Sequence, residues 1–81
     1  MLTSGHILAV QERRFRLITS DGQVYLLTLG VDATVDEMAL HDFRDRHAAV
    51  EVDFSGEPNL VGGVAHAVRL ANDNRTASRA R

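Results

Sequence analysis

The sequence of 81 residues contains no cysteine, so neither a disulfide bond nor a thiolate metal site can stabilise the fold. A chain without cysteine fits a reducing compartment, and we expect a cytoplasmic protein. No apolar run approaches the roughly 20 residues that a membrane-spanning helix requires. The first six residues also lack the basic start and the apolar core of a secretory signal. We therefore expect no contact with a membrane.

Lysine is absent as well, and all nine basic residues are arginines. Residues 71–81 carry three arginines and one aspartate, which leaves −4 on residues 1–70 from a total net charge of −2. A dedicated nucleic-acid-binding domain usually has a basic face on its folded body. Aromatic residues make up only 5% of the chain, which leaves few rings for stacking on bases. The composition therefore argues against that class.

A chain of this length forms one small domain with a thin core. We assign residues 1–70 to a single barrel domain. Residues 71–81 contain no apolar residue larger than alanine, and we expect them to form a disordered basic tail. A small domain without disulfides depends on one apolar core, which self-association can supplement.

Residues 13–30 contain two β-prone runs on either side of Asp21-Gly22, a dipeptide typical of hairpin turns. A two-residue type I′ turn at Asp21-Gly22 would place Leu17 opposite Leu26, and Tyr25 would then share a face with Arg14 and Arg16. A three-residue turn that includes Ser20, with a glycine bulge, would place Leu17 opposite Tyr25 and bury the ring. We favour the second register because it buries more apolar area. Its core side would be Phe15, Leu17, Tyr25, Leu27 and Leu29, and its outer side Arg14, Arg16, Ile18, Val24 and Leu26.

The remaining elements follow from periodicity and turn chemistry. Residues 6–11 predict a first strand, which ends at a polar break or bulge at Glu12-Arg13; one long bent strand over residues 5–19 is the alternative. Thr34 and Glu37 form a capping-box pattern before a helix over residues 35–46. Residues 48–54 alternate between apolar and polar side chains and predict a fourth strand, and residues 64–70 predict the last one. Residues 55–59 predict a loop.

The element order is therefore β-β-β-α-β-β in a mainly β chain with one helix. This order resembles the OB-fold, a Greek-key barrel in which the helix lies between the third and fourth strands and closes one end. An SH3-like barrel is the alternative, although it does not normally contain a full helix at this point. Two stretches, the hairpin of residues 15–22 and the loop of residues 56–60, also resemble small bacterial β-barrel proteins that are uncharacterised.

No constellation in the sequence predicts catalysis, a cofactor or a metal site. The histidines His6, His41, His47 and His66 lie on separate predicted elements and lack the spacing of zinc ligands. The carboxylates of Glu51 and Asp53 fit the solvated side of a strand. No serine has the context of a nucleophile elbow, and no glycine-rich loop precedes a helix that could hold phosphate. We expect no enzyme.

Arg14 and Arg16 lie on one side of their strand in either register, because side chains alternate along a strand. Ligands of OB-folds often bind over the second and third strands. We therefore select Arg14, Arg16 and Tyr25 as candidate binding residues. We expect a non-enzymatic module that binds a protein partner or a second copy of itself. The alternative is a single-stranded nucleic-acid-binding protein that uses the face of the 14–29 hairpin.

Overall fold

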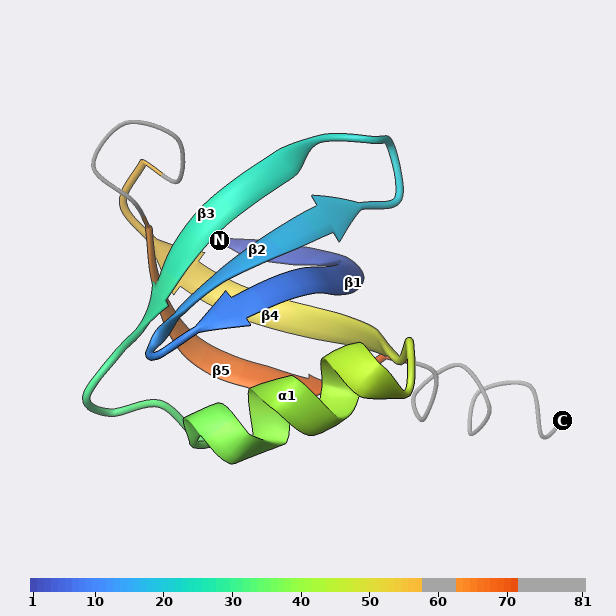
Figure 1. Cartoon of the computed structure of the whole chain (residues 1–81). Coiled ribbons are helices and arrows are strands. Elements are labelled where there is room, and N and C mark those ends of the chain that lie inside the picture. Colours follow the sequence, from blue (N-terminus) through green and yellow to red (C-terminus); the bar gives the residue numbers. More distant parts are fainter. Residues whose placement is uncertain (58–62, 72–81) are drawn as a thin grey trace, which may run out of the picture.

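The computed structural model describes residues 1–57 and 63–71. Five strands and one helix follow each other in the expected order (Figure 1). The strands are β1 (Leu2–Gln11), β2 (Arg14–Thr19), β3 (Val24–Leu29), β4 (Ala49–Ser55) and β5 (Gly63–Leu70), and the helix is α1 (Glu37–Asp45). The predicted loop of residues 55–59 lies partly outside the described residues, as does the predicted tail apart from Ala71.

The strands form a closed barrel in the order β1-β2-β3-β5-β4. All neighbouring strands are antiparallel except β3 and β5, which pair in parallel over three residues of each strand. The predicted fold class, a mainly β barrel with one helix between the third and fourth strands, is confirmed. Among the described residues, no helix has the length and apolar character needed to cross a membrane.

The hairpin of β2 and β3 adopts the favoured register. Leu17 lies opposite Tyr25 and Phe15 lies opposite Leu27. The backbone N–H of Gly22 donates to the carbonyl oxygen of Thr19 at 3.0 Å, and Gly22 has a φ of +90°. A turn that ends on a residue with positive φ is the three-residue loop with a glycine bulge, so the type I′ alternative is wrong.

Strand β1 begins four residues earlier than predicted, because residues 2–6 pair with β4, a partner distant in sequence. The predicted break at Glu12-Arg13 is confirmed as a two-residue connection, in which Glu12 has a φ of +57°.

Strand β1 also approaches β2 closely at Gly5. A Cβ atom at this position would stand 2.0 Å from the carbonyl oxygen of Ile18. A register shift between Ile7 and Ala9 bends the strand further along.

The helix is shorter than predicted, and its cap was assigned wrongly. Asp36, not Thr34, is the N-cap residue: its carboxylate accepts from the backbone N–H of Ala39 at 3.0 Å. The hydroxyl of Thr34 instead accepts from the backbone N–H of Val68 at 3.4 Å. Thr34 thus fastens the connector between β3 and α1 to β5, and the helix begins two residues later than the capping-box pattern suggests.

The core lies inside the barrel and is closed at one end by α1 (Figure 1). Leu40 is the buried residue of the helix, and its side chain is fully shielded from solvent. The strands contribute the other large, nearly inaccessible side chains, which are Phe15, Leu17, Leu27, Leu29, Val50, Val52 and Val68. The inward side of β4, predicted from its alternation, is confirmed by Val50, Val52 and Phe54.

Candidate binding surface

Strand β2 places two arginines on the outside of the barrel. Arg14 and Arg16 are exposed, while the residues between and after them, Phe15 and Leu17, are buried. This alternation follows from the pleat of a strand that has the core on one side and water on the other. Across the strand pair, Arg14 lies opposite Thr28 and Arg16 lies opposite Leu26. Both guanidinium groups therefore project from one surface.

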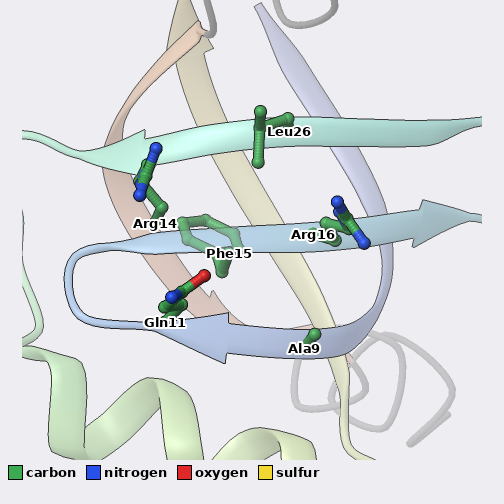
Figure 2. A pocket seen from close by; sticks show the side chains of 6 residues that line it. All are labelled: Ala9, Gln11, Arg14, Phe15, Arg16 and Leu26. Atoms are coloured by element: carbon green, nitrogen blue, oxygen red, sulfur yellow. The ribbon is translucent and has the colours of Figure 1, made fainter.

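An open pocket of about 200 Å³ lies between these arginines (Figure 2). Phe15, of which 1% is exposed, lies beneath it. Leu26 borders the pocket from β3, and β1 contributes Ala9 and Gln11 on the other side. We refer to this surface as the arginine face; its residues are Leu8, Ala9, Gln11, Arg14, Arg16, Val24 and Leu26.

Neither Arg14 nor Arg16 has a hydrogen-bond or ion-pair partner within residues 1–57 and 63–71. The other arginines of the described region all have one. Arg13 donates to the carbonyl oxygens of Leu29 and Gly30 at 3.2 and 2.8 Å. The remaining three pair with carboxylates, as Arg44 with Asp45, Arg46 with Asp42 and Arg69 with Glu51. The positive charge of the arginine face is therefore available to an anionic group from outside.

Exposed apolar side chains lie on the same outer surface, near Arg16. Leu8 is 51% exposed, Val24 44% and Leu26 39%. Leu8 projects at the register shift of β1, where the strand carries an additional residue. The arginine face thus combines apolar area with two guanidinium groups that no described residue pairs with, and can contact a ligand that has an apolar part and a negative charge.

Tyr25 does not belong to this surface. The ring is half-buried on the inner side of β3 and meets Phe54 edge-on, with ring centroids 5.7 Å apart and planes at 63°. The structure therefore brings Arg14 and Arg16 together and separates Tyr25 from both. Sequence reasoning missed Ala9 and Gln11, because the pairing of β1 with β2 has no local turn signal as strong as Asp21-Gly22.

The histidines form no metal cluster with other ligating side chains in the described part of the chain. His66 nevertheless has two polar partners. Its Nε2 lies 2.8 Å from the hydroxyl of Ser55, and its Nδ1 lies 3.0 Å from Oδ1 of Asp32. The hydrogen bond from His66 holds the pKa of the Asp32 carboxyl below its usual value.

A second carboxylate, in the turn between β2 and β3, has a lowered pKa as well. The hydroxyl of Thr19 lowers the pKa of Asp21 through a hydrogen bond.

Comparison with known proteins identifies no relative of this chain: no family model matches the sequence, and neither a curated protein nor a solved structure matches it.

Proposed function

We propose that this barrel is a protein-binding module of the OB-fold type, in line with its resemblance to small bacterial barrels. The strand order and the position of the helix are compatible with that fold. The arginine face binds an acidic protein segment, in which carboxylates flank an apolar side chain. One observation carries the proposal: two guanidinium groups that have no partner among residues 1–57 and 63–71 flank a pocket with an aromatic floor and an apolar wall.

The arginine face carries both charged and apolar groups, and it therefore favours a ligand that has acidic as well as apolar side chains. A guanidinium group pairs with a carboxylate through two parallel hydrogen bonds, which gives direction as well as affinity. Leu26 and Val24 gain most from contact with another apolar side chain, since burial of apolar area is the main source of binding free energy. A peptide segment that presents acidic and apolar side chains on the same side satisfies both requirements.

Single-stranded nucleic acid is less well matched to the same surface. Binding of this kind relies on aromatic rings that stack on successive bases. Tyr25 and Phe54 face inward, and Phe15 is 1% exposed. The arginine face therefore offers charge to phosphates but no exposed ring to bases.

The test compares two charge-reversed proteins. Arg14→Glu/Arg16→Glu reverses the arginine face, and Arg44→Glu/Arg46→Glu makes the same change in net charge at the last turn of α1 and its C-cap. A peptide-display library rich in Asp, Glu and apolar residues is selected on the unmodified protein. We expect the enriched peptides to bind this protein and the helix variant, but to lose at least tenfold in affinity for the arginine-face variant.

Three outcomes would contradict the proposal. Peptides that bind the arginine-face variant equally well would show that this surface is not the site. Salt-dependent binding of oligothymidine that is lost in the same variant would assign the face to nucleic acid. A mass that rises with protein concentration, and falls to that of a monomer in the variant, would assign it to a second copy of the chain. Circular dichroism of both variants controls for folding.

A further inference from the structure

His66 is the extra residue of a β-bulge. Asp53 pairs with Ala67 and Phe54 pairs with Ala65, so His66 has no residue opposite it on β4. A bulge rotates a side chain out of the regular alternation of the strand. The imidazole of His66 is therefore directed along the sheet surface toward Ser55, the last residue of β4. A regular strand would not produce this contact at this register.

The connector between β3 and α1 adds a carboxylate to the same place. Gly30 N–H donates to the carbonyl oxygen of Ala65 at 2.8 Å, and Thr34 N–H donates to that of His66 at 3.2 Å. Between these two anchors, Ala33 N–H donates to the carbonyl oxygen of Gly30 at 3.1 Å and closes a turn that contains Asp32. A Cβ atom on Gly30 would stand 2.9 Å from the Asp32 carboxylate and 3.1 Å from the Ala65 carbonyl oxygen, so the connector docks closely on β5 at this residue.

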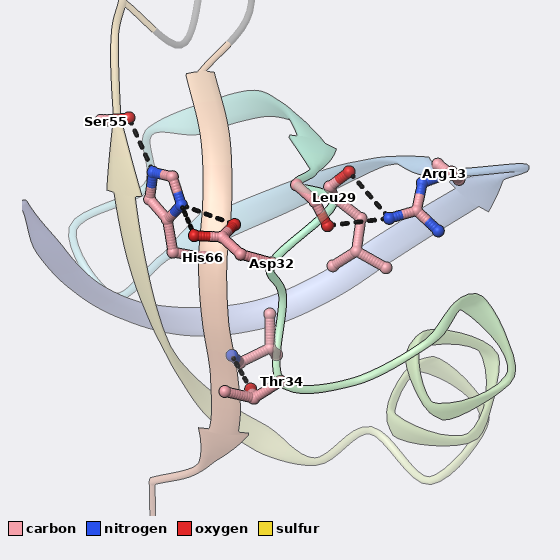
Figure 3. A network of polar contacts seen from close by, with 8 residues as sticks. Arg13, Leu29, Asp32, Thr34, Ser55 and His66 are labelled. Carbon is pink, nitrogen blue, oxygen red and sulfur yellow. Dashed lines mark hydrogen bonds and ion pairs between the residues drawn. The ribbon is translucent and has the colours of Figure 1, made fainter.

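The result is a linear chain of three side chains from three elements (Figure 3). Nδ1 of His66 lies 3.0 and 3.2 Å from the two carboxylate oxygens of Asp32. The carboxylate only accepts hydrogen bonds, so the neutral imidazole carries its proton on Nδ1 and leaves the lone pair on Nε2. Nε2 then accepts from the hydroxyl of Ser55 at 2.8 Å. This is the connectivity of a nucleophile, its base and the group that orients the base.

We propose that Ser55 is an activated nucleophile that accepts acyl groups from small, reactive esters. Ser55 is exposed at the end of β4, and the side chain of His66 is 39% exposed, so an ester in solution can reach both. His66 is the base, and Asp32 is a positioning residue that acts through His66. This activity lies on a different part of the barrel from the arginine face and is independent of the proposed binding function.

The reaction needs no further reagent. The Ser55 oxygen bonds to the ester carbonyl carbon while its proton moves to Nε2 of His66. The carbon–oxygen bond of the ester then breaks, and the leaving oxygen takes the electron pair and the proton from His66. The product is an acyl ester of Ser55 and a free alcohol. Water, deprotonated by the same Nε2, subsequently cleaves the acyl ester to a carboxylic acid and restores the serine.

The experiment treats the full chain with p-nitrophenyl acetate and maps the acetylated residues by peptide mass spectrometry over time. The absence of lysine limits competing acceptors to hydroxyls, imidazoles and the α-amino group. Ser20 is the internal control, because it is exposed and makes no side-chain hydrogen bond with another described residue. We expect Ser55 to be acetylated about 100-fold faster than Ser20, at the lower end of what general-base catalysis provides.

Variants then assign the roles. His66→Ala should reduce the acetylation rate of Ser55 to that of Ser20, and Asp32→Asn should reduce it in part. Asp32→Glu, which keeps the carboxylate, should recover more of the rate than Asp32→Asn at an equal melting temperature. A merely structural role of Asp32 would not distinguish these two variants in rate once both are folded.

Two results would overturn the proposal. The first is equal acetylation of Ser55 and Ser20 in the unmodified protein, which is decisive even if every variant fails to fold. The second is rapid release of p-nitrophenol that persists in Ser55→Ala, since this would assign the reactivity to an imidazole acting alone.

Discussion

Leu17 lies directly opposite Tyr25 across β2 and β3. This single pairing determines which side chains of the hairpin reach solvent. A shift of one residue would transfer every side chain of β3 to the other face. With Leu17 and Tyr25 inside, Arg14 and Arg16 point outward without an exposed ring beside them. The register of one hairpin therefore removes Tyr25 from the candidate surface, which supports our proposal of an acidic protein segment, rather than stacked bases, as the ligand.

The hairpin turn provides the first prediction. Gly22 has a φ of +90°, and no heavy atom lies within 4 Å of the position that a Cβ atom would occupy. Gly22→Ala therefore adds only backbone strain, which we expect to lower the free energy of unfolding by about 1 kcal/mol. Gly22→Asn should lower it less, because asparagine tolerates positive φ better. Urea unfolding measures both; equal stability of the alanine variant and the unmodified protein would contradict the assigned turn.

The same turn explains why the hairpin could be predicted from sequence. The Asp21-Gly22 dipeptide and the alternating strands on either side of it are signals that lie close together in the sequence. The two possible registers of the hairpin differ in the apolar area that they bury, which favours one of them. The beginning of β1 could not be predicted in this way. Its first residues pair with β4, more than 40 positions away, and no local pattern marks that partner.

The second prediction concerns the helix cap. Asp36→Ala should lower the free energy of unfolding by about 1 kcal/mol, because the Ala39 N–H loses the carboxylate that accepts its hydrogen bond. Thr34→Ala is the matched comparison, and it should reduce stability without shortening the helix. Backbone amide exchange distinguishes the two. Faster exchange at Asp36 and Glu37 in the threonine variant, together with unchanged exchange at Ala39 in the aspartate variant, would restore Thr34 as the cap.

The capping error has a physical origin. Thr34-x-x-Glu37 is a valid capping box by residue type, and Asp36 is an equally good cap two residues later. Which residue becomes the cap depends on Val68, because its backbone N–H donates to the hydroxyl of Thr34 and holds this residue against β5. A tertiary contact therefore decides between two local signals of similar strength. The hydrogen bonds that join Asp32, His66 and Ser55 could not be predicted for the same reason. They depend on tertiary structure, namely the bulge in β5 and the docking of the connector between β3 and α1.

The third prediction tests how α1 closes the barrel. Leu40 is fully buried among strand residues, whereas Met38, on the same helix, is 76% exposed. Leu40→Ala should lower the free energy of unfolding by about 3 kcal/mol, through lost burial and the cavity that remains. Met38→Ala should change it by less than about 0.5 kcal/mol. Similar effects of the two substitutions in urea unfolding would show that the helix does not seal the core through Leu40.

The last prediction follows from the lowered pKa of Asp32. His66 donates a hydrogen bond to the ionised carboxylate, so the pKa of Asp32 is lower in the folded chain than in the unfolded one. A lowered pKa adds stability at pH values above the unfolded pKa of about 4, and this contribution is lost as the pH falls through the folded pKa. Asp32→Asn removes the ionisable group. We therefore expect the variant to be less stable than the unmodified protein at pH 6.

Urea unfolding between about pH 6 and pH 2 measures the difference in stability between the two proteins. That difference should shrink as the pH falls below about 4, and close once Asp32 is protonated in both states of the unmodified protein. Asp21→Asn is the matched control, because the pKa of Asp21 is lowered by the hydroxyl of Thr19 instead. His66→Ala should remove most of the pH-dependent difference caused by Asp32→Asn and leave that of Asp21→Asn intact. A pH-dependent difference at Asp32 that survives the loss of His66 would show that the imidazole is not its cause.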